Sequence, residues 1–222
     1  LGLFDNWTGS VELGFNAISG STDRLSARVG LGLRRQTPDT ITTSNFAYNY
    51  GRDNRGLSED RARLDLRNDW IQQAQSGWRY YVNFTGEYDT FQAWDWRVGG
   101  SLGIGYDLIK EKDLTLIGRA GLGASRELGR IDNTVRPEVT PGLDLEWRID
   151  DRMKLISGLD YYRDLDHFEV YRFVARSALE VSLNEKNTVF LRLGVESRYD
   201  EAAGFPRENN DVEVFTSVIF RF

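Results

Sequence analysis

The sequence feature that most constrains the fold is an alternation of apolar and polar residues that recurs along the chain. Over residues 211–222, every second residue from Val212 to Phe222 is apolar or β-branched, and a phenylalanine of that face is the last residue. A period of two is typical of a β-strand with one apolar face. An exposed terminal ring gains little in a soluble domain, whereas a membrane barrel places it in the aromatic girdle. The pattern therefore predicts strands whose apolar side faces lipid.

Composition narrows the alternatives. The chain has 222 residues with 28 Lys+Arg against 34 Asp+Glu, a net charge of -6, so nucleic acid is not an expected partner. Mean hydropathy is -0.48, and no apolar run approaches the roughly 18 residues of a transmembrane helix. The absence of cysteine excludes disulfides and thiolate metal sites, and a single histidine leaves few other metal constellations. No cofactor is predicted.

Twelve strands can be traced by the alternation. The plainest is 61–70, where alanine, leucine and tryptophan alternate with arginine and aspartate. The third rests mainly on aromatic residues, and the eighth contains Pro137 and Pro141, which remove donors from a β-ladder. The expected strands cover residues 7–17, 25–34, 42–52, 61–70, 78–88, 96–108, 114–124, 138–148, 155–161, 171–181, 189–195 and 211–222.

Three features oppose a soluble β-sandwich or a lipocalin-like barrel. Most strands extend to ten or more residues, as a tilted membrane crossing requires, whereas soluble strands average nearer five or six. The polar faces carry arginine and aspartate through their middles. Aromatic residues lie near strand ends: Trp7, Trp70, Trp78, Trp96, Trp147, Tyr199 and Phe222.

The connections indicate the orientation. Those after even strands are mostly tight, and those after odd strands are mostly longer, as at 53–60, 127–135 and 200–210; the turn Ser19–Asp23 is an exception. Short periplasmic turns and longer outer loops are typical of bacterial barrels with an even number of strands. We expect one domain, residues 1–222, folded as an all-β, closed, antiparallel transmembrane barrel of twelve strands with both termini periplasmic. The expected location is the bacterial outer membrane, after removal of a signal peptide.

Three segments carry a family resemblance. They are the turn Ser19–Asp23, the aromatic strand Trp78–Tyr88 with the Asp89-Thr90-Phe91 that follows it, and the glycine-rich segment Arg97–Leu108. Together they resemble the YdiY-like family of salt-induced outer-membrane proteins, a domain of unknown function. The family's turn usually has asparagine where this chain has Ser21. The resemblance implies an outer-membrane barrel and a link to salt or osmotic stress, and it implies no reaction.

The last strand also resembles the terminal assembly signal of bacterial outer-membrane barrels. The residues that carry this likeness are Val218, Phe220 and Phe222. The resemblance implies recognition by the barrel-assembly machinery. A barrel in this membrane is also expected to contact lipids and lipopolysaccharide, with other outer-membrane proteins as further candidate partners.

The alternation turns many charged side chains toward the lumen, with basic residues in excess. The inward basic residues include Arg28, Arg63, Arg67, Arg79, Arg97, Arg119, Arg172, Arg176 and Arg192. The inward acidic residues include Glu12, Asp65, Glu87, Asp144, Glu146, Asp160, Glu180 and Glu196. Charges at this density must be paired or hydrated. They predict either a salt-bridge lattice that fills the barrel or the selectivity elements of an open pore that favours anions.

One side of the lumen is expected to be apolar. The residues concerned are Ile156, Val170, Val174, Phe190, Phe215 and Ile219. They predict a packed internal core, with a seat for an apolar ligand or a partner segment as the alternative.

The sequence offers few candidate residues for catalysis. The glycines at 99, 100, 103 and 105 lie within a strand pattern with no following Lys-Ser/Thr or helix, so a phosphate loop is not predicted. Several inward glycines instead leave room for side chains such as Tyr81. His167 has acidic neighbours at Asp164 and Asp166, but Glu169 stands where the Ser-His pair of twelve-stranded outer-membrane phospholipases would need serine. No catalytic, cofactor-binding or metal-ligating residue is predicted.

Two classes of function therefore remain. The first is a narrow channel for ions or small solutes that serves osmotic adjustment. The second is a sealed, non-conducting barrel that stabilises the membrane or acts as an accessory subunit of a larger assembly. An outer-membrane hydrolase is a remote third.

Overall fold

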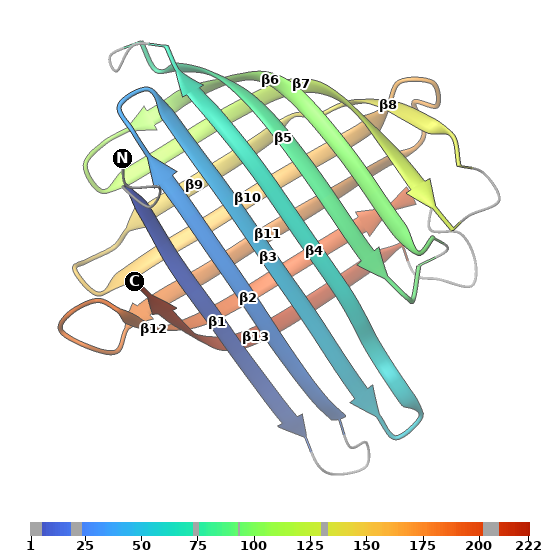
Figure 1. Ribbon diagram of the computed structural model, residues 1–222, viewed down its shortest axis with the longest axis horizontal. Helices are drawn as coiled ribbons and strands as arrows, with labels where there is room; N and C mark the ends of the chain where they lie inside the picture. Colours follow the sequence, from blue (N-terminus) through green and yellow to red (C-terminus); the bar gives the residue numbers. More distant parts are fainter. Residues whose placement is uncertain (1–5, 19–23, 73–75, 93, 130–132, 202–208) are drawn as a thin grey trace.

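The computed structural model describes residues 6–18, 24–72, 76–92, 94–129, 133–201 and 209–222, without the side chains of 16–18 and 24. They form one antiparallel sheet that closes on itself, because β13 pairs with both β12 and β1 (Figure 1). The strands are β1 (Trp7–Ile18), β2 (Arg24–Gln36), β3 (Thr40–Asp53), β4 (Gly56–Ile71), β5 (Trp78–Asp89), β6 (Trp96–Lys110), β7 (Leu114–Leu128), β8 (Val135–Val139), β9 (Gly142–Arg148), β10 (Met153–Asp164), β11 (Tyr171–Ser182), β12 (Val189–Asp200) and β13 (Asn210–Arg221).

The barrel wall has the predicted twelve positions, because β8 and β9 are two halves of one strand. Both pair with β7 on one side and β10 on the other. The prediction of a continuous strand over 138–148 is wrong at Thr140 and Pro141. Pro141 has no N–H to donate to the ladder, so the chain breaks there, while Thr140 N still donates to Gly121 O at 2.8 Å.

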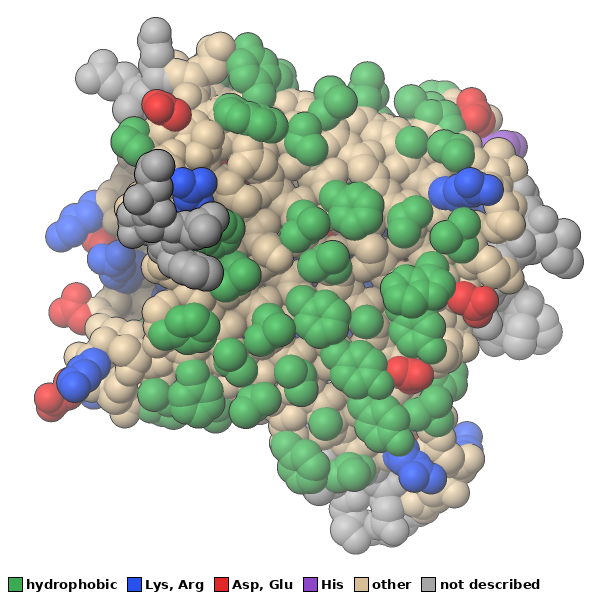
Figure 2. Space-filling model, viewed as in Figure 1, with side chains coloured by type: hydrophobic (Ala, Val, Ile, Leu, Met, Phe, Trp, Pro, Cys, Tyr) green, Lys and Arg blue, Asp and Glu red, His purple; other side chains and the backbone are tan. Residues whose placement is uncertain are grey.

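The alternation places apolar side chains on the outer face of the wall. Leu13, Leu102 and Leu122 are at least half exposed, whereas Glu12, Arg79 and Glu180 are buried inside. Figure 2 shows apolar side chains spread over the visible face, with most charged side chains at the two ends. An apolar exterior around a charged interior is the arrangement of a barrel in lipid. No helix in the described part of the chain is long and apolar enough to cross a membrane.

Aromatic side chains lie near the strand ends, as predicted, and several of them form pairs. Toward the end that holds the termini, the rings of Trp78 and Tyr106 lie 4.8 Å apart, and toward the opposite end those of Tyr88 and Trp96 lie 5.0 Å apart. Tyr199 adds a stacked contact with its neighbours on β11. Two levels of aromatic rings are typical of the two interfaces of a membrane.

Both termini lie at the same end of the barrel (Figure 1), where Gly9 N donates to Phe222 O at 2.8 Å. The predicted long connection at 53–60 is wrong, because β3 and β4 continue to a two-residue turn at Asn54–Arg55. The turn predicted at Ser19–Asp23 lies outside the described residues. Part of the predicted 200–210 connection also lies outside them.

The pairing between β1 and β13 is short. It covers five register pairs, from Ser10↔Arg221 to Gly14↔Ser217, and is extended at the termini by Gly9 and Phe222. By contrast, β1 pairs with β2 over all twelve of its residues, and β12 pairs with β13 over eleven. Beyond Gly14 the two strands diverge toward the end opposite the termini, which is named the outer end of the barrel (Figure 1).

Candidate functional site: the charged lumen and its outer cavity

The lower lumen, nearest the termini, contains a chain of ion pairs centred on Glu12. This β1 carboxylate accepts from Arg28 Nε of β2 at 3.0 Å, Arg192 Nη1 of β12 at 2.5 Å and Ser217 Oγ of β13 at 2.8 Å. Arg192 also pairs with Glu180 at 2.6 Å. Glu12 is 7% exposed, so its charge depends on these partners rather than on water. The cluster joins the four strands on both sides of the short β1–β13 pairing.

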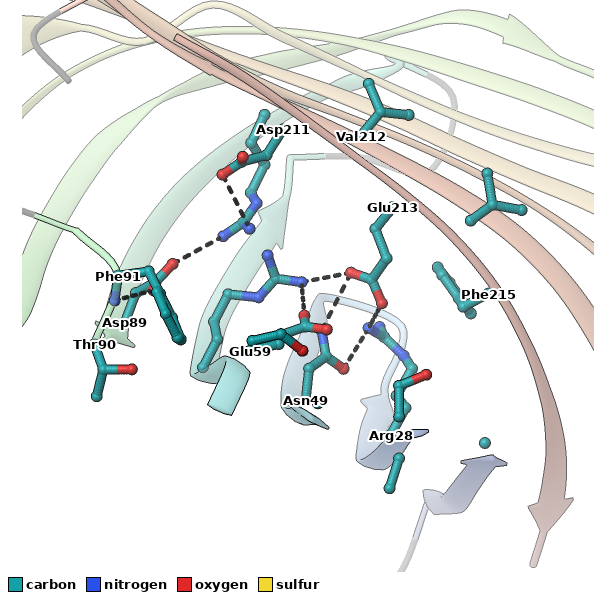
Figure 3. Close-up of a pocket in the computed structure, with 18 of the residues that line it drawn as sticks. Arg28, Asn49, Glu59, Asp89, Thr90, Phe91, Asp211, Val212, Glu213 and Phe215 are labelled. Atoms are coloured by element: carbon teal, nitrogen blue, oxygen red, sulfur yellow. Dashed lines mark hydrogen bonds and ion pairs between the residues drawn. The ribbon is translucent and has the colours of Figure 1, made fainter. Parts of the chain in front are cut away.

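A second cluster lies higher in the lumen and is centred on Glu213 of β13. Its carboxylate pairs with Arg61 of β4, accepts from Asn49 Nδ2 of β3 at 3.2 Å, and lies 3.6 Å from Arg28 Nη1 of β2. Glu59 also pairs with Arg61, at 3.1 Å. Figure 3 shows Glu213 extending from β13 toward Asn49 and Arg28. Side chains therefore link β13 to β2, β3 and β4 at the level where its backbone no longer pairs with β1.

Ion pairs also cross the lumen from wall to wall, near its outer rim and at its middle. Arg97 of β6 lies 2.5 Å from Asp200 Oδ2 of β12 and 2.5 Å from Glu127 Oε1 of the neighbouring β7. Arg176 of β11 pairs with Asp160 on β10 and lies 3.9 Å from Asp65 of β4. Strands β4 and β11 stand on opposite sides of the barrel in the order of the sheet. These guanidinium groups therefore bridge the lumen rather than lining one wall.

A third group occupies the lumen below this level. Asp144 of β9 accepts from Arg67 of β4 at 2.8 Å and from Arg119 of β7 at 2.6 Å. Arg119 reaches Asp69 of β4 as well, at 2.6 Å. Shared carboxylates thus connect β4 to β7 and β9, which are not its neighbours in the sheet. Arg79 pairs with Asp107 nearby.

The structure turns the predicted charged residues inward, and it brings most of them into these clusters. Arg63 pairs with Asp65 and Glu87, and Arg172 pairs with Glu138 at 3.0 Å. Glu196 is buried 3.6 Å from Arg198. Glu146 differs, because its side chain is 54% exposed at the mouth nearest the termini, where it lies 2.6 Å from Lys154.

The predicted apolar side of the lumen is interrupted by charge. Phe190 and Ile219 are register partners and both are buried, but the guanidinium of Arg221 lies 4.2 Å from the Phe190 ring centroid. Phe215 lies under Arg28 at 4.2 Å and against Gly194. Val174 is buried higher up, with Asp160 as one cross-strand partner, and the half-buried Ile156 has Glu146 as one of its own. Val170 precedes β11, half-buried at the outer rim, beside Arg97. The six residues therefore do not form one continuous patch.

A cavity of about 1030 Å³ lies at the outer end, beside the divergence of β1 and β13 (Figure 3). Its polar side contains Arg28, Asn49, Arg61 and Glu213, and Phe91 closes part of its rim. Four further cavities along the lumen have volumes of about 10–40 Å³ each. Of these five cavities, the one at the outer end is by far the largest.

Some residues of these clusters were not identified from the sequence. Trp94 lies in the connection before β6, is 5% exposed, and its ring centroid is 4.5 Å from the Arg97 guanidinium. A lone tryptophan in a connection gives no periodic signal. Asn49 and Asp200 also belong to the lattice. The alternation of the third strand could have identified Asn49, because Asn49 shares with Ala47 and Gly51 the face that points into the lumen.

The histidine considered for catalysis is exposed. His167 is in the connection after β10, its side chain is 66% exposed, and its Nδ1 lies 3.9 Å from Asp164 Oδ2. The Asp164 carboxylate accepts from the backbone N–H groups of Asp166 and His167, at 2.8 Å and 3.0 Å. It therefore shapes the turn. Among the described residues, no group of three or more His, Asp or Glu side chains is arranged to hold a metal ion.

The residues of the predicted assembly signal lie on the outer face of β13 and at its end. Phe220 and Phe222 are 44% and 77% exposed, and Val218 is half-buried beside Leu13. The Phe222 ring lies against Gly9, where an added Cβ would collide with it. The terminal aromatic residue is thus positioned at the junction that closes the barrel.

Comparison with known proteins assigns the family. Residues 11–222 match the family described as "Protein of unknown function, DUF481", and the chain belongs to it. No curated protein gives a significant sequence match. The name YdiY and salt induction are not part of this match.

Solved structures show the same fold at low identity. The NanC porin matches with a TM-score of 0.52 and 10% identity, over 96% of this chain and 98% of that one. The COG4313 outer membrane channel from Pseudomonas putida F1 gives 0.52 and 11%, over 97% and 94%. The KdgM porin in complex with disordered oligogalacturonate gives 0.51 and 10%, over 96% and 99%. The likeness shows the fold: a closed, twelve-strand, antiparallel barrel that resembles outer-membrane porins.

Proposed function

We propose that this protein is an outer-membrane barrel whose lumen is closed by an arginine–carboxylate lattice and which serves adaptation to salt or osmotic stress. The observation that carries the closed lumen is the set of ion pairs between distant walls. Arg97 connects β6 to β12, and Arg176 lies between β10 and β4. A solute passing through the barrel would have to displace both guanidinium groups from their carboxylates.

The energetics favour a closed state. Removing one member of a buried ion pair costs roughly 3–5 kcal/mol, because the remaining charge is left without a partner. The side chains of Arg97 and Asp200, which form the bridge from β6 to β12, are 10% and 20% exposed, so their pairing is only weakly screened. Raised salt weakens exposed pairs first, such as Lys154–Glu146 at the mouth. The lattice is therefore expected to persist at high ionic strength.

The role in salt adaptation rests on the resemblance of the segment Arg97–Leu108 to the salt-induced family. A sealed barrel serves such a role as a stabilising element or as an accessory subunit that binds other outer-membrane proteins, lipids or lipopolysaccharide. Its delivery to the membrane would use the barrel-assembly machinery, which recognises Phe222 and the alternating strand before it. The termini are periplasmic in this arrangement, and the outer cavity faces the exterior.

A narrow channel is the second candidate. The large cavity at the outer end favours it, because this part of the barrel already holds a space of about 1030 Å³. Two of the similar structures are named porins, but at 10% identity they support the fold only. In an open state the arginines of the lattice would line the path and favour anions.

Ion flux from proteoliposomes tests the proposal. Wild-type protein should leave a KCl gradient as stable as it is in protein-free vesicles. The double variant Arg97→Ala, Arg176→Ala should dissipate it at least about tenfold faster, because two bridging side chains are removed. Arg148→Ala is the matched control, since this arginine is 59% exposed at the mouth. Rapid flux through wild-type protein would support the channel instead.

The physiological part needs a separate test. A strain that lacks the gene should grow more slowly in raised salt, and the wild-type gene should restore growth. Equal growth of the two strains across salt concentrations would contradict a role in salt adaptation without bearing on the closed lumen.

A further inference from the structure

The short pairing of β1 and β13 leaves an opening in the side of the barrel. Pairing among the described residues ends at Gly14↔Ser217, although β13 continues to Asn210 and β1 to Ile18. A sheet edge exposed to hydrocarbon is unfavourable, because its backbone N–H and C=O groups find no partner there. Such an edge is tolerated where it lines a water-filled cavity. The edge in this barrel borders the outer cavity.

The cavity reaches both sides of the wall at this opening. Phe15 of β1 and Val212 and Val214 of β13 line it, and they are 69%, 62% and 78% exposed on the outer face. Arg61 and Glu213 line it from the lumen. A path therefore runs from the apolar exterior to the polar interior without passing the Arg176 bridge at the middle of the lumen.

The opening lies at the depth of the hydrocarbon. Tyr199 belongs to the outer aromatic level, stacks on Tyr171 with 5.2 Å between centroids, and is the register partner of Asn210. Val212 and Val214 lie two and four residues further toward the middle of the barrel. At about 3.3 Å per residue, this is roughly 7–13 Å along the strand below the interface. Lipid chains of that leaflet are therefore next to the opening.

The charges of the cavity indicate what it accepts. Its lining contains three arginines and four acidic residues: Arg28, Arg61, Arg198, Glu59, Asp89, Asp211 and Glu213. Each arginine already has a carboxylate partner; Arg198, for example, lies 3.8 Å from Asp89. With one carboxylate more than arginines, the lining repels an anionic head group, and it does not repel an uncharged or cationic one. The volume is at the upper end of the roughly 300–1,000 Å³ of small-molecule pockets.

We propose that the opening between β1 and β13 is a lateral gate that admits an uncharged or cationic single-chain amphiphile from the membrane into the outer cavity. Its hydrocarbon chain lies between Phe15 and Val214, and its head group lies among the polar residues of the lumen. Glu213 is the latch, because its contacts with Arg28, Asn49 and Arg61 hold β13 to β2, β3 and β4 on the far side of the opening. The inference goes beyond the proposed function and needs only the membrane location, not a closed lumen.

Photolabelling in lipid vesicles tests the gate. The probe is dodecylamine with a diazirine at the end of its chain, added to phosphatidylcholine vesicles that contain the protein. Because the sequence has no cysteine, the pair Phe15→Cys, Thr216→Cys can form only one disulfide. These positions would face each other if the register were extended by one pair. Oxidation should lower labelling of cavity-lining peptides about tenfold, since it removes the open state.

A control cysteine pair and two competing amphiphiles are included in the labelling experiment. The control pair Leu13→Cys, Val218→Cys lies within the existing register, so its oxidation should leave labelling unchanged. Excess 1-dodecanol should compete with the probe, and dodecyl sulfate should not. Labelling that survives oxidation of the Phe15–Thr216 pair, or that is confined to outward residues such as Leu102, would overturn the gate. Equal competition by dodecyl sulfate would overturn the assigned head group.

The latch has its own readout, which also applies if the cysteines fail to cross-link. Glu213→Gln should speed labelling of the cavity by about tenfold, because a neutral amide holds the arginines less tightly. Glu146→Gln is the control, since that residue is 54% exposed at the other mouth. An unchanged labelling rate in Glu213→Gln would refute the latch. Ion flux measures the lumen independently, so failure of the gate and failure of the sealed barrel are distinguishable.

Discussion

Glu12→Ala is the substitution that the lattice predicts to be most informative for stability. It deletes a carboxylate held by Arg28, Arg192 and Ser217, at the short pairing that closes the barrel. Breaking a buried ion pair costs roughly 3–5 kcal/mol. The loss is moderated because Arg192 retains Glu180 at 2.6 Å and Arg28 retains Glu213 at 3.6 Å. We expect a destabilisation of about 3 kcal/mol.

The assay is denaturant unfolding in phospholipid vesicles, followed by the fluorescence of the six tryptophans and by heat-modifiable gel mobility. Glu146→Ala is the matched control, because that exposed pair should contribute only about 0–1 kcal/mol. Glu12→Gln should fall between the two, since it keeps the volume and can still accept from Ser217 Oγ. A 3 kcal/mol loss is a change of roughly a hundredfold in the folding equilibrium. Equal unfolding midpoints for Glu12→Ala and Glu146→Ala would refute the reasoning.

Three further substitutions probe other parts of the account. Gly121→Ala should destabilise the barrel by about 1–3 kcal/mol in the same unfolding assay, because the added Cβ would collide with the Tyr81 hydroxyl. Gly86→Ala is the control and should be neutral, because the nearest atom to its added Cβ is 3.8 Å away; equal effects of the two would contradict the packing. Phe222→Ala should lower the amount of protein in the outer membrane of cells while refolding into vesicles in vitro proceeds as in wild type, and unchanged cellular levels would argue against an assembly signal. His167→Ala should leave stability within about 0.5 kcal/mol of wild type, since the side chain is exposed, and a larger loss on unfolding would show an unrecognised contact.

The alternation predicted the barrel and its faces because every residue of a membrane-spanning strand must face either lipid or the lumen. Positions such as Arg63, Arg97 and Glu180 follow from parity alone. The alternation shows which face of the strand a residue occupies but not how deep in the barrel it lies. It therefore could not distinguish the buried Glu12 from Glu146, which is exposed at the mouth. It also could not predict which carboxylate an arginine meets, because contacts such as Arg97–Asp200 depend on tilt and side-chain reach across the lumen.

The errors have physical causes. Residues 53–60 are polar and were expected to form a loop, but a hairpin that extends beyond the membrane meets water on both faces and needs no alternation. The break at Pro141 follows from its missing N–H, although the sequence alone did not show whether the strand would end or continue. The short β1–β13 pairing has no local signal, because it depends on how the last strand meets the first.

The most direct test of the central claim is single-channel recording of the refolded wild-type protein in a planar bilayer, in molar salt and across a salt gradient. Folding is verified beforehand by heat-modifiable mobility. A sealed barrel should give a silent bilayer, because the bridges of Arg97 and Arg176 close the lumen, and current steps should appear when both arginines are replaced by alanine. Reproducible steps in the wild type, with a reversal potential shifted toward that of the anion, would contradict the sealed barrel and establish a channel.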